Sequence, residues 1–278
     1  MNKLKSIFIS TYLTYAAIIA TIQIIQFTQS WDVAWLMSAL VHLLPVGFIA
    51  KLFLTHTPRT DQNLNAVTIA MFGLMIAVMI LMSSLPTAYP RLFTFALITL
   101  AGWILYLKWY SVLPARGDIL AIGKSLPELA LEHTDGSQVN TSTFLGKKTL
   151  YMFYRGNWCP LCMAQIKEIA QQYKQLDELG VQMVLVSSQP HSHSANLAKK
   201  HDVPFIFLAD PKGKASKTIG VNHDGGTAFG MEVFGYSSNT LLPTVIITNE
   251  LGQIIFLDQT DNYRVRPEPE TFIKALGQ

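Results

Sequence analysis

The sequence is poor in cysteine and in acidic residues, and each shortage narrows what the chain can be. It has two cysteines in 278 residues, which excludes a fold held together by several disulfides. In residues 1–113 the only acidic side chains are those of Asp32 and Asp61. The formal net charge of the whole chain is +3, so charge gives no support for a nucleic-acid partner.

The acid-poor half contains four long apolar runs. Each has the length of about 20 residues that crosses a ~30 Å hydrocarbon core, and short polar breaks separate them. We therefore expect residues 1–113 to form a four-helix transmembrane domain. The first run is too long for a cleaved signal peptide and is followed at once by a second one. The runs cover residues 6–27, 33–54, 64–85 and 92–112.

The basic residues of this half predict its orientation in a membrane. Loops on the cytoplasmic side carry the excess of lysine and arginine. In a bacterial inner membrane this bias places the N-terminus and the C-terminal domain in the cytoplasm, with Arg91 alone on the opposite side. The residues on the predicted cytoplasmic side are Lys3, Lys5, Lys51, Arg59, Lys108 and Arg116.

His42 is the one ionisable residue well inside a predicted span. Such a residue is a candidate for function, but a neutral histidine that bonds a neighbouring helix is the simpler interpretation and the one we favour. No cysteine lies in any span, so the predicted bundle has no dithiol of its own to carry electrons across a membrane. Its simplest role is to anchor the rest of the chain.

Both cysteines fall in one motif in the second half of the chain. Cys159 and Cys162 follow an apolar run and precede a helical pattern, and a C-x-x-C at a strand-to-helix junction is typical of a thioredoxin-like redox site. The first turn of a helix stabilises a thiolate and lowers its pKa. A disulfide closing so short a loop would restrict the unfolded chain little, which disfavours a purely structural bond.

A zinc site is the other interpretation of a C-x-x-C. Zinc requires four ligands, and the sequence has no further cysteine, so histidines would have to complete the set. We expect His191, His193 and His201 to be solvated instead, and we expect no metal and no other cofactor. The candidate ligands are His191, His193, His201 and His223.

The second half predicts an α/β thioredoxin-like domain. Residues 114–124 combine proline, glycine and mixed charge, which indicates a linker, and residues 125–278 alternate between strand and helix patterns. We expect strands at 126–131, 149–154, 181–187, 205–208, 244–248 and 254–257, and helices at 162–179, 192–201, 211–219 and 268–276.

Five motifs carry a resemblance to a known family. They are Leu126-Pro127, Asp135-Gly136, the segment 153–162 (FYRGNWCPLC), the segment 208–211 (LADP) and the segment 242–244 (LPT). With them, residues 123–278 resemble the alkyl hydroperoxide reductase/thiol-specific antioxidant family, the peroxiredoxin-like branch of the thioredoxin superfamily. The resemblance implies a cis proline at Pro243 that lies against the cysteine pair and shapes a substrate groove.

Two alignments of the central motif imply different chemistry. Against thioredoxins, Cys159 is the exposed nucleophile and Cys162 the resolving thiol, although Phe153 replaces the buried aspartate of that family. Against peroxiredoxins, the attacking cysteine falls on Cys162, Cys159 replaces a threonine, and Arg155 replaces a proline. The resemblance to peroxiredoxins also implies an arginine from a distant part of the chain that holds the peroxide.

The position of the arginines argues against the peroxidase alignment. Residues 156–263 contain none, and Arg264 and Arg266 follow the predicted hairpin. From the sequence we therefore expect no arginine from a distant part of the chain at the cysteine pair.

The leading hypothesis is a membrane-anchored thiol–disulfide oxidoreductase in which Cys159 attacks a substrate disulfide and Cys162 resolves it. The second is a thiol-dependent peroxidase with antioxidant activity, and the third is a redox-sensing or docking module at the membrane that is not an enzyme. The expected partner is a disulfide-bearing protein or a thioredoxin-like reductant. The candidate supporting residues are Trp158, Arg155, Pro160, Pro243 and Thr244.

Overall fold

The computed structural model describes residues 2–83, 90–201 and 203–277. The chain divides into two compact units, which are described separately. The helical unit comprises Ile7–Thr55 and Thr60–Val112, and the α/β unit comprises Met1–Ser6, His56–Arg59 and Leu113–Gln278. The α/β unit is therefore assembled from three separate segments of the chain.

Apolar helices make up the helical unit. α1 (Asn2–Ser30), α2 (Val33–Thr55), α3 (Asn65–Ser83) and α4 (Pro90–Leu105) follow one another, and a π-helical turn, η1 (Tyr106–Tyr110), extends α4. Large apolar side chains also cover their outer faces, for example Leu54 and Ile69, which are 78% and 70% exposed. Helices that are apolar on every side suit a hydrocarbon surrounding rather than water.

Three of the described helices are long and apolar enough to cross a membrane: Asn2–Ser30, Val33–Thr55 and Pro90–Tyr110. The described apolar part of α3, Asn65–Leu81, is shorter. The expected third span, residues 64–85, extends into residues 84–89, which lie outside the described part of the chain. The count of four spans therefore stays a prediction.

Polar contacts join the helices inside this unit. The His42 ring nitrogen Nδ1 lies 2.5 Å from Thr99 Oγ1, and the Tyr12 hydroxyl donates to the Thr99 carbonyl at 3.0 Å. Trp103 Nε1 donates to Thr68 Oγ1. His42 therefore has the neighbouring-helix partner that its simpler interpretation requires.

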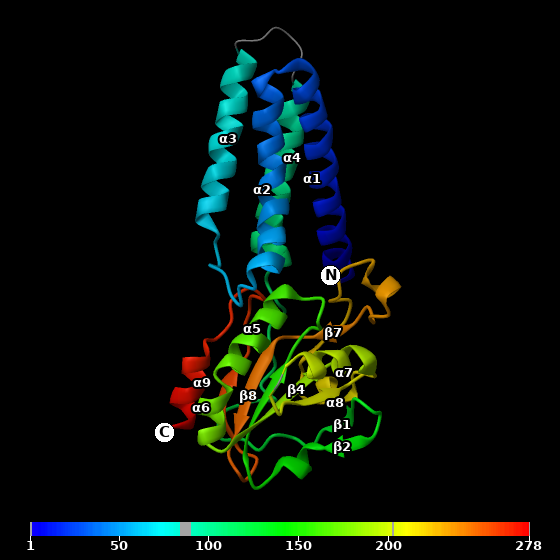
Figure 1. The fold of residues 1–278 in the computed structure, drawn as a ribbon, viewed down its shortest axis with the longest axis vertical. Coiled ribbons are helices and arrows are strands. Elements are labelled where there is room, and N and C mark those ends of the chain that lie inside the picture. Colours follow the sequence, from blue (N-terminus) through cyan, green and yellow to red (C-terminus); the bar gives the residue numbers. More distant parts are fainter. Residues whose placement is uncertain (1, 84–89, 202, 278) are drawn as a thin grey trace. The chain divides into compact units, whose positions relative to one another are not determined.

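A mixed sheet forms the centre of the α/β unit (Figure 1). Its seven strands lie in the order β2-β1-β5-β4-β3-β8-β9. β3, β4 and β5 are parallel to one another, and the remaining pairs are antiparallel. The strands are β1 (Ala130–His133), β2 (Gln138–Asn140), β3 (Lys148–Phe153), β4 (Val181–Ser187), β5 (Ile206–Ala209), β8 (Thr244–Thr248) and β9 (Ile254–Asp258).

Helices flank this sheet and a two-stranded sheet adjoins it. The helices are α5 (Pro160–Gln171), α6 (Tyr173–Glu178), α7 (His191–Lys200), α8 (Lys214–Thr218) and α9 (Pro269–Leu276). Short 3-10 turns lie at η2 (Thr141–Phe144) and η3 (Met231–Phe234), and the small sheet pairs β6 (Asn222–His223) with β7 (Thr240–Leu241). The arrangement confirms the expected thioredoxin-like α/β domain.

The first strand and the first helix of the α/β unit differ most from the sequence-based expectation, which also did not include β2, β6 and β7. β1 begins at Ala130 rather than at residue 126, because Pro127 has no N–H for a ladder and the Leu129 N–H donates to Thr141 Oγ1 instead. It lies between β2 and β5 rather than at the edge of the sheet. The expected helix 162–179 is interrupted at Gln172. The second piece, α6, buries Leu176 completely and packs against β4.

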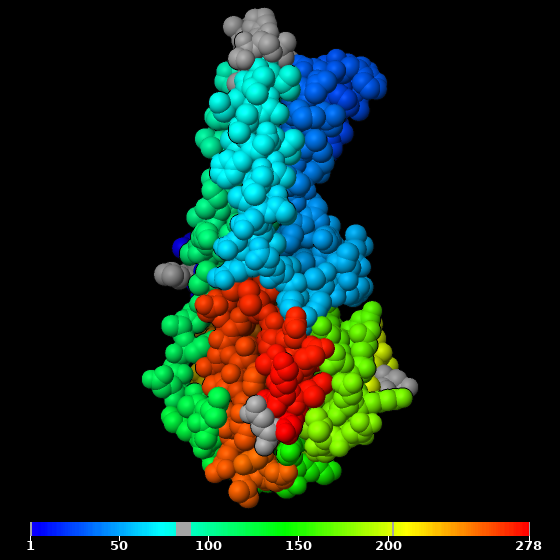
Figure 2. Space-filling view, turned by 90° about the vertical axis from the view of Figure 1, so that its left-hand side faces the viewer, coloured from blue at the N-terminus to red at the C-terminus, as the bar shows by residue number. Residues whose placement is uncertain are grey.

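The C-terminal helix closes one side of the α/β unit. α9 contacts β9, and Figure 2 shows the red C-terminal segment on the surface beside the orange residues that precede it. Its Phe272 is fully buried, and the Phe272 and Phe256 rings meet edge to face at 5.7 Å. The amphipathic pattern of α9 therefore serves to bury one aromatic against the sheet.

Candidate active site

The cysteine motif begins where β3 ends. The Tyr154 N–H still donates to the Val186 carbonyl of β4, and the chain then turns at Gly156, whose φ is +142°. A side chain there would meet the indole of Trp158, since a Cβ would lie 2.7 Å from Trp158 Nε1. Glycine at this position therefore allows Trp158 to pack against the loop.

The helix α5 then begins at the cysteines. Cys159 is the N-cap residue with extended backbone, and Pro160 lies in the first turn, where its missing N–H costs no helical hydrogen bond. Cys162 lies in the same turn. Both are free thiols and both are buried, with 1% and 0% exposed.

Arg266 reaches the site from the segment after β9. Its Nη2 donates to Cys162 Sγ at 3.4 Å, its Nη1 donates to Gln165 Oε1 at 3.1 Å, and its Nε donates to the Tyr263 carbonyl at 2.9 Å. These contacts fix a buried guanidinium beside the sulfur. The expectation that no distant arginine reaches the cysteine pair is therefore wrong.

The topology explains why the spacing along the chain was misleading. β8 is antiparallel to β3, with Thr244 opposite Phe153, and β9 returns antiparallel to β8, with Asp258 opposite Val245. β9 therefore runs in the same direction as β3, and the two strands end on the same side of the sheet. The predicted hairpin of β8 and β9 would have placed Arg266 near the cysteines only if its pairing with β3 had also been predicted.

The two thiols are unequal. Burial raises the pKa of the Cys159 thiol, and its hydrogen bond to Cys162 raises that pKa further. Burial opposes ionisation of Cys162 as well. However, the hydrogen bond from Cys159, the charge of Arg266 and the backbone N–H of Arg155 together bring the pKa of Cys162 well below its usual range. The surroundings thus favour ionisation of Cys162 over ionisation of Cys159.

Arg155 adds a second buried cation. Its Nη2 donates to the Gly226 carbonyl at 2.6 Å, and its guanidinium carbon lies 4.7 Å from the Trp158 ring centre and 5.1 Å from that of Tyr263. The Arg155 carbonyl accepts from Thr240 Oγ1. The structure therefore brings Arg155, Trp158 and Tyr263 together.

Pro243 and Thr244 lie near this site but not as the resemblance implied. No peptide bond is cis among residues 2–83, 90–201 and 203–277, so the bond before Pro243 is trans and the cis expectation is wrong. A trans proline is permitted at the start of a strand, and Pro243 directly precedes β8. Both residues line one small hollow with Arg266, and the Pro243 carbonyl accepts from Arg116 Nη2.

A polar network that sequence reasoning missed holds the loop before Cys159. Gln189 Oε1 accepts from the Asn157 N–H at 2.8 Å, and its Nε2 donates to the Tyr154 hydroxyl at 3.1 Å. The Tyr236 hydroxyl donates to Asn157 Oδ1 and lies 2.8 Å from His193 Nδ1. Only the pairing of distant segments reveals these contacts, because Gln189 and Tyr236 belong to no motif.

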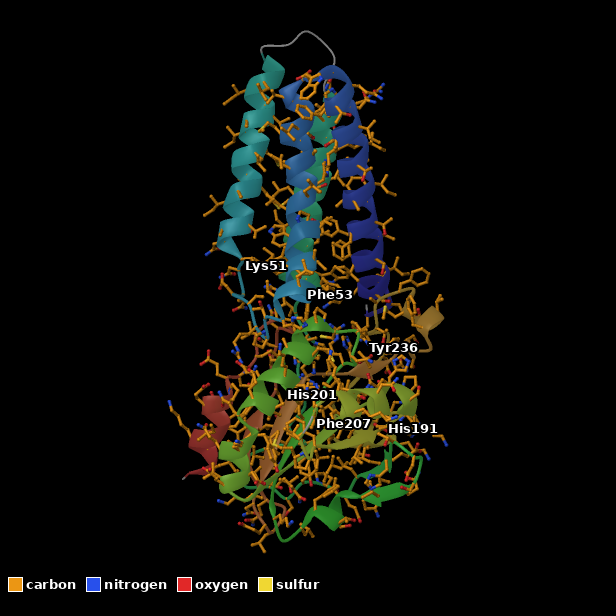
Figure 3. All side chains as sticks on the ribbon, viewed as in Figure 1. Lys51, Phe53, His191, His201, Phe207 and Tyr236 are labelled. Carbon is orange, nitrogen blue, oxygen red and sulfur yellow. The ribbon has the colours of Figure 1, made fainter. Side chains whose placement is uncertain are left out.

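Two of the histidines expected to be solvated, His191 and His193, have side-chain partners. His191 pairs with Glu132 at 2.9 Å, and His193 contacts Tyr236, which Figure 3 labels together with His191. His223 is buried, and its pKa falls to about 3 through burial, with the charges of Arg155, Lys5 and Arg116 lowering it further. Within the described part of the chain, no group of three or more histidine, cysteine or acidic side chains is placed to hold a metal ion.

A thioredoxin-like sheet with two free, unequal thiols at the start of a helix defines a thiol-based oxidoreductase of the thioredoxin superfamily. The chain belongs to the Redoxin family, whose model matches residues 121–273, more than half of its length. The family assignment supports the peroxiredoxin-like resemblance and identifies the protein as an enzyme.

Curated relatives include peroxiredoxins and a thiol-disulfide oxidoreductase. The chain is 27% identical over 139 residues to chloroplastic peroxiredoxin Q of Sedum lineare, which covers 50% of this chain and 74% of the relative. It is 33% identical over 103 residues to the peroxiredoxin Q of Populus jackii, and this match covers 37% of this chain and 48% of the relative. It is also 26% identical over 121 residues to the thiol-disulfide oxidoreductase ResA of Bacillus cereus, and this match covers 43% of this chain and 67% of the relative.

Solved structures share the fold of the α/β unit. Reduced Prx3 of Vibrio vulnificus, determined in complex with hydrogen peroxide, aligns with a TM-score of 0.50 at 20% identity. The alignment covers 56% of this chain and 99% of that protein. At this identity the likeness concerns the fold alone.

Proposed function

We propose that this protein is a thiol-dependent peroxidase in which Cys162 attacks the peroxide. One observation carries the proposal: a buried arginine, Arg266, donates a hydrogen bond to Cys162 Sγ. A guanidinium stabilises the attacking thiolate and is also a donor for the oxygen that leaves. This reverses the order expected from the sequence, in which disulfide exchange led by Cys159 stood first.

The reaction uses both cysteines. The Cys162 thiolate attacks one peroxide oxygen, the O–O bond breaks, and the other oxygen leaves and takes a proton to become water or an alcohol. Cys162 is then a sulfenic acid. Cys159 attacks its sulfur, an S–S bond forms, and the hydroxyl leaves as water. An external dithiol, such as a thioredoxin-like protein, reduces the disulfide and completes the cycle.

Thiol–disulfide exchange is the second candidate. The C-x-x-C pair and the similarity to ResA favour it, and it requires the same two thiols. In the scheme expected from the sequence, Cys159 forms the mixed disulfide and Cys162 releases it. The raised pKa of Cys159 weighs against this scheme, because the thiolate is the reactive form.

The helical unit supports the proposal that the enzyme is membrane-bound. Its three candidate spans, together with the shorter α3, would anchor the chain. We retain from the sequence the four-span count, the domain boundaries at 113 and 125, and a cytoplasmic location for the α/β unit. A redox-sensing role without turnover is the remaining alternative.

The test is peroxide reactivity of the full chain in detergent. We expect the reduced protein to consume hydrogen peroxide far faster than a free dithiol does, with a Trp158 fluorescence change as the disulfide forms. Cys162→Ser should abolish the reaction, and Cys159→Ser should stop it at the sulfenic acid after one equivalent.

The opposite pattern would support disulfide exchange. In that case hydrogen peroxide reacts no faster than with a free dithiol, Cys159→Ser abolishes activity on protein disulfides, and Cys162→Ser accumulates mixed disulfides. A protein that reacts with neither substrate would leave the sensing role.

A further inference from the structure

Arg59 makes an extensive set of contacts with the segment that supplies Arg266. Its guanidinium binds the Glu168 carboxylate with both ends, Nη1 to Oε1 at 2.9 Å and Nη2 to Oε2 at 2.5 Å. The same guanidinium donates through Nε to the Arg266 carbonyl and through Nη2 to the Pro267 carbonyl, both at 3.2 Å. Arg59 is one of the four residues, His56–Arg59, that join the α/β unit from the chain between α2 and α3.

These contacts join two parts of the active site. Glu168 lies on α5, the helix that carries Cys162, and residue 266 carries the guanidinium that contacts Cys162 Sγ. Arg59 therefore links the backbone beside Arg266 to the helix beneath Cys162. The link depends on a planar side chain with several fixed donors, which lysine does not have.

The segment that Arg59 holds needs such support. Residues 259–268 form neither a helix nor a strand of the main sheet, and their backbone is held by a bridge at Asn262 and by turn bonds that extend to Val265. Gln165 and the Tyr263 carbonyl orient the Arg266 guanidinium, but both contacts presuppose that the backbone lies at the right distance from α5. Arg59 bonds to the backbone at that point.

We propose that Arg59 is a positioning residue for the thiol chemistry, which holds the Arg266 guanidinium on Cys162 by bonding residues 266 and 267 to Glu168. The proposal rests on the proposed role of Cys162 as the attacking thiolate. Neither the motif nor the family resemblance points to Arg59, which lies 103 positions before Cys162 in the printed sequence.

The test measures the reactivity of each cysteine against pH in the full chain. Iodoacetamide labels the thiolate, and mass spectrometry of the peptides separates Cys162 from Cys159. Besides Cys159, the charged or titratable groups that act on Cys162 are Arg155, Arg266 and Tyr154. All are retained, so a change in the Cys162 profile reports the placement of Arg266.

We expect Arg59→Ala to shift the midpoint of Cys162 labelling upward by about one pH unit, which equals a roughly tenfold loss of thiolate below the midpoint. Glu168→Gln should shift it in the same direction, and Arg59→Lys should restore little. Glu268→Gln is the matched control, because its carboxylate lies 4.0 Å from Arg59 Nη1 and is 63% exposed. It should leave the profile unchanged.

Each outcome has a distinct meaning. If the wild-type protein itself labels at the pH of an ordinary thiol, the proposed role of Cys162 fails. If the wild-type midpoint is low and Arg59→Ala and Glu168→Gln leave it in place, the positioning role fails by itself, even where the thermal midpoint of unfolding falls. Should Arg59→Ala not fold, Glu168→Gln decides, because it keeps the side-chain shape.

Discussion

At the scale of single residues, the charge of Arg266 is the main external support of the Cys162 thiolate. A buried thiolate is costly unless a cation and hydrogen bonds compensate for lost water. Arg266 supplies the cation, while Cys159 and the Arg155 backbone supply hydrogen bonds. The Cys162 thiolate is thus stabilised in part because Cys159 keeps its proton and donates it in a hydrogen bond.

Arg266→Lys should weaken the stabilisation of the Cys162 thiolate although it keeps the positive charge. An ammonium group cannot contact Cys162, Gln165 and the Tyr263 carbonyl at once, as the guanidinium does. We expect the rate with hydrogen peroxide at neutral pH to fall by about tenfold or more, one pKa unit being a factor of ten. Stopped-flow measurement across pH checks this, and an unchanged pH midpoint would contradict it.

Stability should also depend on the ionisation of Cys162. Its pKa is lowered in the folded protein and lies near 8.5 in the unfolded chain. The stabilisation is therefore complete above about pH 8.5 and is lost as the pH falls through the folded value. We expect the unfolding free energy of the wild-type protein, minus that of Cys162→Ser, to rise with pH in this window. Denaturant titrations of both proteins measure the difference, and a flat difference would sink the idea.

At the scale of elements, strands were more predictable than the contacts between them. The apolar sequences of β3 and β4 predict that these strands are buried, and the amphipathic pattern of α9 predicts that the face carrying Phe272 is buried. The position of Arg266 depends on how β9 pairs with β8 and β8 with β3. No local pattern contains that information, and the same is true of Gln189 and Tyr236.

The packing of α9 gives an element-level prediction. Phe272 is fully buried against Phe256, so Phe272→Ala should destabilise the fold by roughly 3–5 kcal/mol, the usual cost of such a cavity. Thr271→Ala, at the exposed neighbouring position, is the control and should cost little. Thermal unfolding of the two variants provides the comparison, and equal midpoints would argue that α9 does not contribute to the core.

At the scale of the whole molecule, the chain combines an apolar helical unit with a redox unit. The apolar runs were visible in the sequence because hydrocarbon requires long stretches without charge. Their predicted orientation rests on the lysine and arginine residues beside the spans, and it places the α/β unit on one side of the membrane.

We expect the full chain to remain with the membrane fraction after alkaline carbonate extraction. For the side of the membrane, Leu251→Cys in a Cys159→Ser/Cys162→Ser background places one thiol at a position that is 75% exposed. An impermeant maleimide should label it only after cells are opened. Labelling in intact cells would place the α/β unit outside the cytoplasm.

The three-segment composition of the α/β unit has a practical consequence. In the sequence, residues 114–124 read as a single boundary, after which a separable module begins. In space the module also contains the stretch that carries Arg59. A gene fragment that starts at residue 114 would encode both cysteines and Arg266 but not the side chain that bonds to residues 266 and 267. Such a fragment would be an incomplete copy of the enzyme rather than its free form.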